Sequence, residues 1–159
     1  FFFYMSVRES TWADIHKWIV RYHDEKPSFL ELSRLLRVFS IEVQTPNGSS
    51  ALHLAALGSE HYCASYLLRK GANVNHQNDT GLTPLHYACR SGNLNTVVLL
   101  LQYGADHTII DQDLNTPLHH AVEAGQYDVV RHLVIGKYCN LSSQNQNGRT
   151  PLSVACKEG

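Results

Sequence analysis

A four-residue motif recurs along this chain at an almost constant interval. Thr-Pro-Leu-His begins at Thr83 and again at Thr116, which is 33 residues later. A related copy, Ser-Ala-Leu-His, begins at Ser50, and Thr-Pro-Leu-Ser begins at Thr150. An interval of this size is too short for a domain and too long for one helix or strand. The chain is therefore built from copies of a small supersecondary unit that stack on one another.

The copy that begins at Thr83 indicates how each unit folds. Threonine is a favoured N-cap, and proline is tolerated at the first helical position because its missing N–H has no partner there. We predict a first helix from Pro84 to Ser91 that ends at Gly92, and a second helix from about Leu94 to Tyr103. The second helices should each bury one apolar stripe. These predicted stripes are Leu94, Val97, Val98 and Leu101, then Tyr127, Val130 and Val134, and more weakly Cys63, Ala64, Leu67 and Leu68.

Two departures from the period have structural consequences. Leu114 stands where the neighbouring copies have Gly81 and Gly148. A residue with a Cβ atom should strain that turn or change its shape. The third copy also carries one extra residue between Gly136 and Asn140, which should bulge the loop after its second helix.

The period and the Thr-Pro-Leu-His-x-Ala motif resemble the ankyrin-repeat family, and the resemblance covers about residues 47–159. It implies an all-α solenoid of stacked helix–turn–helix units whose hairpins project to one side. The units are 47–78, 79–112 and 113–147, followed by a partial fourth repeat at 148–159. A terminal unit of one helix buries little surface, so we expect this chain to be part of a longer protein.

The segment before the repeats is different in character. Residues 1–9 form an apolar N-terminal arm, and residues 10–46 hold two helical patterns without the motif. Terminal repeats are often atypical because one face meets solvent, so we interpret 10–46 as a divergent helical N-terminal cap, a degenerate repeat. The alternative is a distinct helical module fused to the array. The face with Trp12 and Trp18 is a second candidate contact surface.

Composition excludes several classes of function. The net charge is -1 and the pI is near 6.9, which gives no basic footprint for nucleic acid. The apolar start is too short to insert in a membrane. The four cysteines contain no Cys-x-x-Cys pair, so neither a metal site nor a disulfide is expected. Cys63, Cys89 and Cys156 fall at small apolar repeat positions and should be buried thiols. That favours the cytoplasm, with the nucleus possible.

The resemblance implies a non-enzymatic scaffold or adaptor that binds a protein partner through its hairpin tips and concave face. The alternative is the recognition or regulatory arm of a larger enzyme, channel or degradation adaptor whose activity lies elsewhere. Tyrosine and arginine are frequent at the energetic centres of interfaces. The candidate partner-binding residues are Tyr87, Arg90, His120 and Glu123 as the central cluster, Asp79, Leu82, Asp113 and Asn115 on the hairpins, and Leu54 and Leu57 on the first repeat.

Two hypotheses concern the chemistry of individual residues. His119 and His120, with Cys139 nearby, are residue types found in metal and nucleophile sites, but His119 belongs to the repeat motif and its role should be structural. We therefore assign no catalytic residue, metal or cofactor. Asn75 resembles an asparagine that an oxygenase hydroxylates in some ankyrin hairpins and is a candidate modification site. The favoured interpretation is that Asn75 bonds the hairpin backbone.

Overall fold

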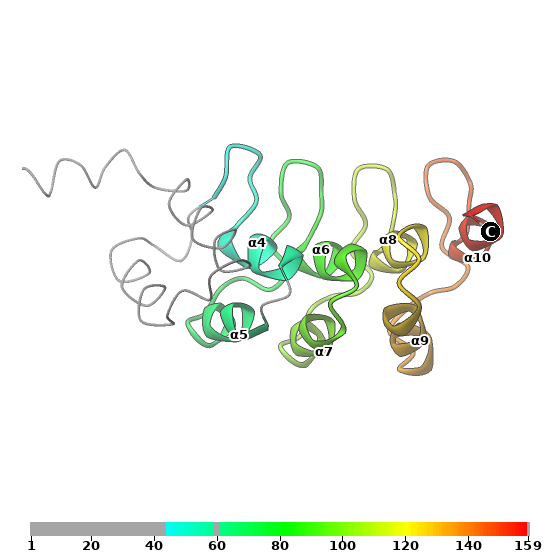
Figure 1. Cartoon of the computed structure of the whole chain (residues 1–159). Coiled ribbons are helices and arrows are strands. Elements are labelled where there is room, and N and C mark those ends of the chain that lie inside the picture. The colour runs from blue at the N-terminus through cyan, green and yellow to red at the C-terminus, as the bar shows by residue number, and fades with distance from the viewer. Residues whose placement is uncertain (1–43, 59–60, 159) are drawn as a thin grey trace, which may run out of the picture.

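The computed structural model describes residues 44–58 and 61–158, and these form one row of helix pairs (Figure 1). This described part contains seven helices and no strand, as expected for an all-α ankyrin solenoid. The first helices of the units are α4 (Ala51–Leu57), α6 (Pro84–Ser91), α8 (Pro117–Glu123) and α10 (Pro151–Glu158). The second helices are α5 (His61–Arg69), α7 (Leu94–Gln102) and α9 (Tyr127–Ile135).

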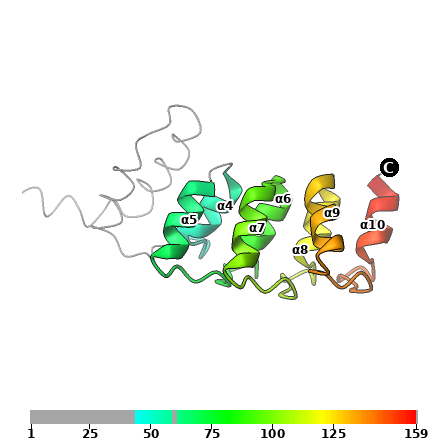
Figure 2. The same ribbon diagram turned by 90° about the horizontal axis from the view of Figure 1, so that it is seen from below.

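The helices lie in two layers. The first helices pack in sequence order, α4 on α6, α6 on α8 and α8 on α10. Helices α5, α7 and α9 form a second layer, which lies below the first in Figure 1 and nearer the viewer in Figure 2. The loops that lead into each first helix project together on one side of the row (Figure 1). Side chains of the first helices and of these hairpins therefore share one face, which we call the concave face.

The recurring motif starts each first helix and joins it to the next repeat. Thr83 is the N-cap of α6, and the ring of His86 reaches back so that Nδ1 accepts the Thr83 N–H at 3.1 Å. Because Nδ1 accepts, the proton of the neutral ring is on Nε2, which donates to the carbonyl oxygen of Asn115 in the next hairpin at 3.3 Å. His53 and His119 bond in the same way to the carbonyls of Leu82 and Arg149.

Burial removes these motif histidines from water and holds them neutral. The side chains of His53, His86 and His119 are almost fully buried. Desolvation lowers the pKa of His53 and of His86 to about 4, and it also lowers the pKa of His119. The partial fourth repeat has Ser153 in place of this histidine, and its backbone N–H donates to the hydroxyl of Thr150 instead.

The core lies between the two helix layers, and it corrects part of the predicted stripes. The stripe of α5 is confirmed, because Cys63, Ala64, Leu67 and Leu68 are all buried. In α7 the buried residues are Thr96, Val97 and Leu100, whereas Leu94, Val98 and Leu101 are half-buried. In α9 the buried residues are Val129 and Leu133, while Tyr127 and Val134 are exposed. The predicted stripe of α7 is therefore confirmed in part, because Val97 is in the core and Leu94 and Leu101 pack against it. The predicted stripe of α9 is confirmed only for Val130, which packs against the core.

The cysteine expectations hold for two residues and fail for one. Cys63 and Cys89 are buried, and burial raises the pKa of the Cys89 thiol far above its ordinary value. Cys156 is exposed, contrary to the prediction, because no described helix packs on the outer side of α10. Cys89, Cys139 and Cys156 are free thiols in the structure.

The hairpin turn at Leu114 keeps the shape of its neighbours and is strained. Leu114 adopts φ +60°, close to the +79° of Gly81 and the +69° of Gly148. Its N–H donates to the carbonyl of Asp111 at 3.0 Å, as the N–H of Gly81 does to Asn78 at 2.9 Å. The left-handed conformation costs about 1–2 kcal/mol for a residue with a Cβ atom.

Leu114→Gly should have a free energy of unfolding about 0.5–1 kcal/mol higher than Leu114→Ala, because relief of this strain exceeds the extra entropy of glycine in the unfolded chain. Both variants lose the partly buried side chain of Leu114, which is 43% exposed, so the difference between them reports the backbone strain. Urea unfolding followed by circular dichroism measures the difference. Gly81→Ala is the opposing control, because a Cβ atom there would lie 3.1 Å from the backbone of Asp111. A Leu114→Gly variant that is no more stable than Leu114→Ala would contradict the account.

The extra residue of the third repeat lies at Tyr138–Cys139. Lys137 (φ +57°) occupies the turn position that Gly104 has after α7. The next backbone hydrogen bond shows that the two repeats still correspond, residue for residue, as far as Tyr138. The Tyr138 N–H bonds to Leu133 as the Ala105 N–H does to Leu100. The predicted arm at 1–9 and nearly all of the predicted cap at 10–46 lie outside the described residues.

Candidate functional site

The hairpins form a row whose backbones are bonded to one another. The N–H of Asp79 donates to the carbonyl of Asn47 at 3.1 Å, that of Gln112 to Thr80 at 3.0 Å, and that of Gln146 to Asp113 at 2.8 Å. Inside each of the last three hairpins, one side-chain oxygen at the base accepts two backbone N–H groups, as Asn78 Oδ1 does from Thr80 and Leu82. Side chains at the hairpin tips therefore project from a fixed backbone.

The predicted central cluster divides into two neighbouring groups. Tyr87 is half-buried on α6, and its hydroxyl lies 3.3 Å from both Ser49 Oγ and Asn78 Nδ2. Its ring stands edge-on to His53, with the ring centroids 5.2 Å apart. The guanidinium of Arg90 lies over the same ring, 5.3 Å from its centroid, and is otherwise exposed. A cation on an aromatic face is attracted to the ring, which holds the two side chains together.

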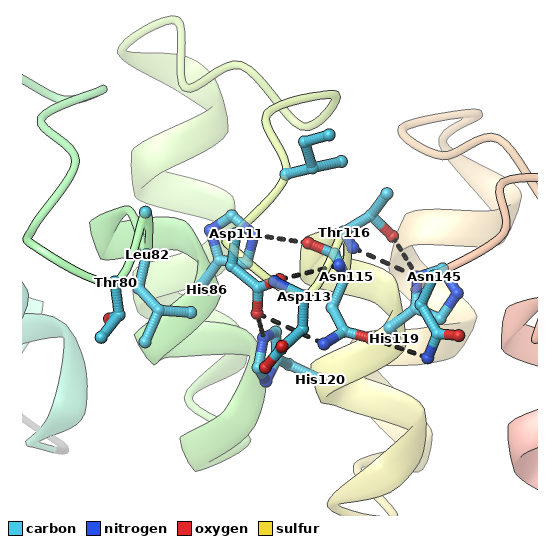
Figure 3. A network of polar contacts seen from close by, with 12 residues as sticks. Thr80, Leu82, His86, Asp111, Asp113, Asn115, Thr116, His119, His120 and Asn145 are labelled. Carbon is cyan, nitrogen blue, oxygen red and sulfur yellow. Dashed lines mark hydrogen bonds and ion pairs between the residues drawn. The ribbon is translucent and has the colours of Figure 1, made fainter. Parts of the chain in front are cut away.

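The second group is a polar pair between Asp111, at the base of the third hairpin, and His120 on α8 (Figure 3). His120 Nε2 lies 2.8 Å from Asp111 Oδ2, and the side chains are 11% and 7% exposed. The other oxygen of Asp111 accepts the N–H groups of Asp113 and Asn115. Burial alone would raise the pKa of Asp111, but the hydrogen bonds from His120 and Asn115 outweigh it and lower that pKa. Asp111 is therefore ionised at neutral pH, which fixes the proton of the His120–Asp111 bond on Nε2.

A cleft of about 350 Å³ opens beside this pair, between α8 and α10. Three predicted residues besides His120 line it, namely Asp113, Asn115 and Glu123. Asn115 is engaged within the protein, because its Oδ1 accepts from Asn145 and its backbone carbonyl from His86. Asp113 and Glu123 are exposed and face the cleft as carboxylates. The residues of this cleft that the predicted set omitted are Asp111, His119, Asn145, Asn147, Arg149, Val154 and Lys157.

The other predicted residues lie outside this cleft. Leu54 is half-buried and Leu57 is 47% exposed, both on α4 at the start of the described row. Asp79 is exposed on the second hairpin, while the backbone carbonyl of Leu82 accepts the bond from His53. The concave face thus brings four of the ten predicted contact residues into one cleft, and it leaves the rest distributed along the row.

Asn75 has a structural role in the hairpin row. Its Oδ1 accepts the N–H of Asp106 at 2.7 Å, and its Nδ2 donates to the carbonyl of Gly104 at 3.3 Å. The favoured interpretation, that Asn75 bonds hairpin backbone, is confirmed, although the backbone belongs to the next hairpin. Hydroxylation of Asn75 stays a prediction.

His119 and Cys139, which are residue types found in metal and nucleophile sites, have other contacts in the structure. Both ring nitrogens of His119 are engaged, by Thr116 and by the Arg149 carbonyl, and Cys139 Sγ lies 3.5 Å from the Leu133 carbonyl. Across residues 44–58 and 61–158, no three His, Cys, Asp or Glu side chains are grouped as metal ligands. The described helices include none that is both long and apolar enough to span a bilayer.

Comparison with known proteins assigns the fold to a family. The family model described as ankyrin repeats (3 copies) matches residues 18–111 and 107–159, so the match extends into the segment before the first clear motif. No curated protein gives a significant match. Repeats of this family generally mediate protein–protein contacts and are typically non-catalytic. On its helix pairs, its hairpin row and this match, the chain belongs to the ankyrin-repeat family.

Proposed function

We propose that this chain is a non-enzymatic recognition module, a scaffold or adaptor that holds a protein partner on its concave face. The observation that carries the proposal is the fixed hairpin row, in which backbone bonds join each hairpin to the next. Side chains of different chemistry stand at equivalent positions of that row. Such a surface is organised before binding, so little conformational entropy is lost when a partner docks.

The centre of the proposed contact surface is formed by Tyr87, Arg90, His120 and Glu123. Tyr87 and Arg90 support each other through the cation–π contact, while His120 is held by Asp111. The surface carries both signs of charge, and the chain has a net charge of -1, which suits a protein partner better than nucleic acid. The free thiols of Cys89, Cys139 and Cys156 favour the cytoplasm or nucleus. The same surface would serve if the chain were the recognition arm of a larger protein.

Affinity capture with paired variants tests this proposal. The whole chain is immobilised and exposed to lysate from its native source, beside a Tyr87→Ala/Arg90→Ala variant. The matched control is Tyr127→Ala/Arg131→Ala, which removes an exposed tyrosine and an exposed arginine from α9 in the other helix layer. Circular dichroism confirms that both variants remain folded.

A partner that the first variant loses and the control keeps is the expected result. Loss by the control alone would place the contact on the α5–α7–α9 layer and contradict the proposal. Equal retention by both variants would exclude Tyr87 and Arg90 as the centre of the interface.

A further inference from the structure

The seventh residue of each first helix forms a row along the concave face. These residues are Leu57 on α4, Arg90 on α6, Glu123 on α8 and Lys157 on α10. All four are exposed, and the helices that carry them pack consecutively. After the apolar Leu57, the row therefore alternates in charge, positive, negative and positive, with one charge on each repeat.

Neighbouring side chains strengthen this alternation toward the C-terminal end. Glu123 shares the cleft with the carboxylate of Asp113, and Lys157 shares it with the guanidinium of Arg149. The backbones of Asp113 and Arg149 are tied by hydrogen bonds to Asp111 and Asn145, so both side chains start from fixed points. The cleft thus has an acidic wall from the third repeat and a basic wall from the fourth. At the second repeat, the contact with the Tyr87 ring positions Arg90.

The spacing of the row matches one extended backbone conformation. Packed helices lie about 8–10 Å apart, so consecutive charges of the row are separated by about that distance along the solenoid. A polyproline II segment advances about 3.1 Å per residue with three residues per turn, so every third side chain returns to the same face after about 9 Å. In a β-strand every second side chain returns to the same face, after about 7 Å, and this spacing does not match that of the row.

We infer that the partner of the proposed function presents an extended, polyproline II-like segment with the charge pattern acid-x-x-base-x-x-acid. The acidic side chains of the segment lie against Arg90 and Lys157, and the basic side chain lies against Glu123. The inference rests on the proposed function and adds the chemistry and spacing of the segment that docks. It concerns a protein segment, because alternation of sign along the row repels the middle of a uniformly anionic ligand and both ends of a uniformly cationic one.

Synthetic peptides test the inference without knowledge of the partner. The matched peptide contains Glu-Pro-Ala-Arg-Pro-Ala-Glu. A second peptide has the same composition and net charge, with its charged residues placed two apart. A third has the matched spacing with inverted signs, Arg-Pro-Ala-Glu-Pro-Ala-Arg. Each is titrated into the isotopically labelled whole chain, and binding is read from amide chemical shifts.

The matched peptide should bind about tenfold more tightly than the respaced peptide, the combined effect of three exposed ion pairs. Its shifts should centre on the ends of α6, α8 and α10, and binding should weaken strongly at about 1 M salt, where the screening length falls to about 3 Å. The triple variant Arg90→Glu/Glu123→Arg/Lys157→Glu changes only exposed residues and should prefer the inverted peptide.

Equal binding of the matched and respaced peptides, or no binding of either, would overturn the inference. So would a triple variant that keeps the preference of the parent chain. If the peptides fail while affinity capture still depends on Tyr87 and Arg90, the proposed function stands and only the charge pattern is wrong. If capture is also insensitive to Tyr87 and Arg90, the proposed function itself fails.

Discussion

The protein should lose several kcal/mol of its free energy of unfolding between pH 6.5 and pH 4. His53 and His86 are buried as neutral rings with pKa values of about 4 in the folded state. The ordinary pKa of 6.5 applies in the unfolded chain. As pH falls below 6.5, the unfolded chain takes up protons that the folded state excludes, so stability decreases until the folded pKa is reached.

The expected loss is about 3 kcal/mol for each of the two histidines, because one pKa unit corresponds to about 1.4 kcal/mol. His119 adds to the loss in the same direction. Asp111, whose folded pKa is lowered, contributes stability that disappears only at more acidic pH. Since single domains are stable by about 5–15 kcal/mol in total, a large share of the array should be unfolded near pH 4.

Urea unfolding at several pH values between 4 and 7.5 measures this dependence. His86→Gln is the informative variant, because glutamine does not titrate and its amide can still donate to the Asn115 carbonyl that His86 contacts. The variant should be less stable at pH 7, but its stability should fall less steeply with acid, by about 1.4 kcal/mol per pH unit at mid-range. Parallel pH profiles for the two proteins would show that His86 is not the source of the acid sensitivity.

The fold was predictable from the sequence because the repeat motif determines where each first helix begins as well as the architecture. The predicted first helix at Pro84–Ser91 has the bounds seen in α6, since the threonine cap, Pro84 and Gly92 determine both ends. Strain at Leu114 was likewise predictable from glycines at equivalent positions. The stripe of α7 was predictable only in part, because Leu94, Val98 and Leu101 are as apolar as the fully buried Val97 and Leu100.

The candidate site was predictable in part. The spacing of 33 residues places Tyr87 and His120 at equivalent positions, and the structure puts both on the concave face. The bond from His120 to Asp111 was missed, although a signal existed. The hairpin-base residue is Asn78 in one neighbouring repeat and Asn145 in the other, and only here is it an acid. The cleft itself was missed, because Arg149 and Lys157 lie on different elements and sequence spacing does not show that both line one cleft.

Leu100→Ala should be one of the most damaging single truncations on α7, with a loss of about 2–5 kcal/mol in the free energy of unfolding. Leu100 is fully buried between the helix layers, and Leu67 and Leu133 occupy the same position in the neighbouring repeats. The next residue offers a matched control of the same chemistry, because Leu101 is only half-buried. Leu101→Ala removes the same atoms and should cost about 1 kcal/mol, since less apolar surface leaves water when Leu101 packs.

Urea unfolding of the two variants decides the register of the α7 stripe. Equal losses, or a larger loss for Leu101→Ala, would return the stripe to the register first expected from the sequence. The slope of the transition carries further information, because α7 packs against both α5 and α9. In a repeat array each unit is stabilised by its neighbours, so a cavity in the second repeat weakens two interfaces at once. An unchanged slope would mean that the array still unfolds as one unit, and a shallower slope would mean that it separates at the second repeat.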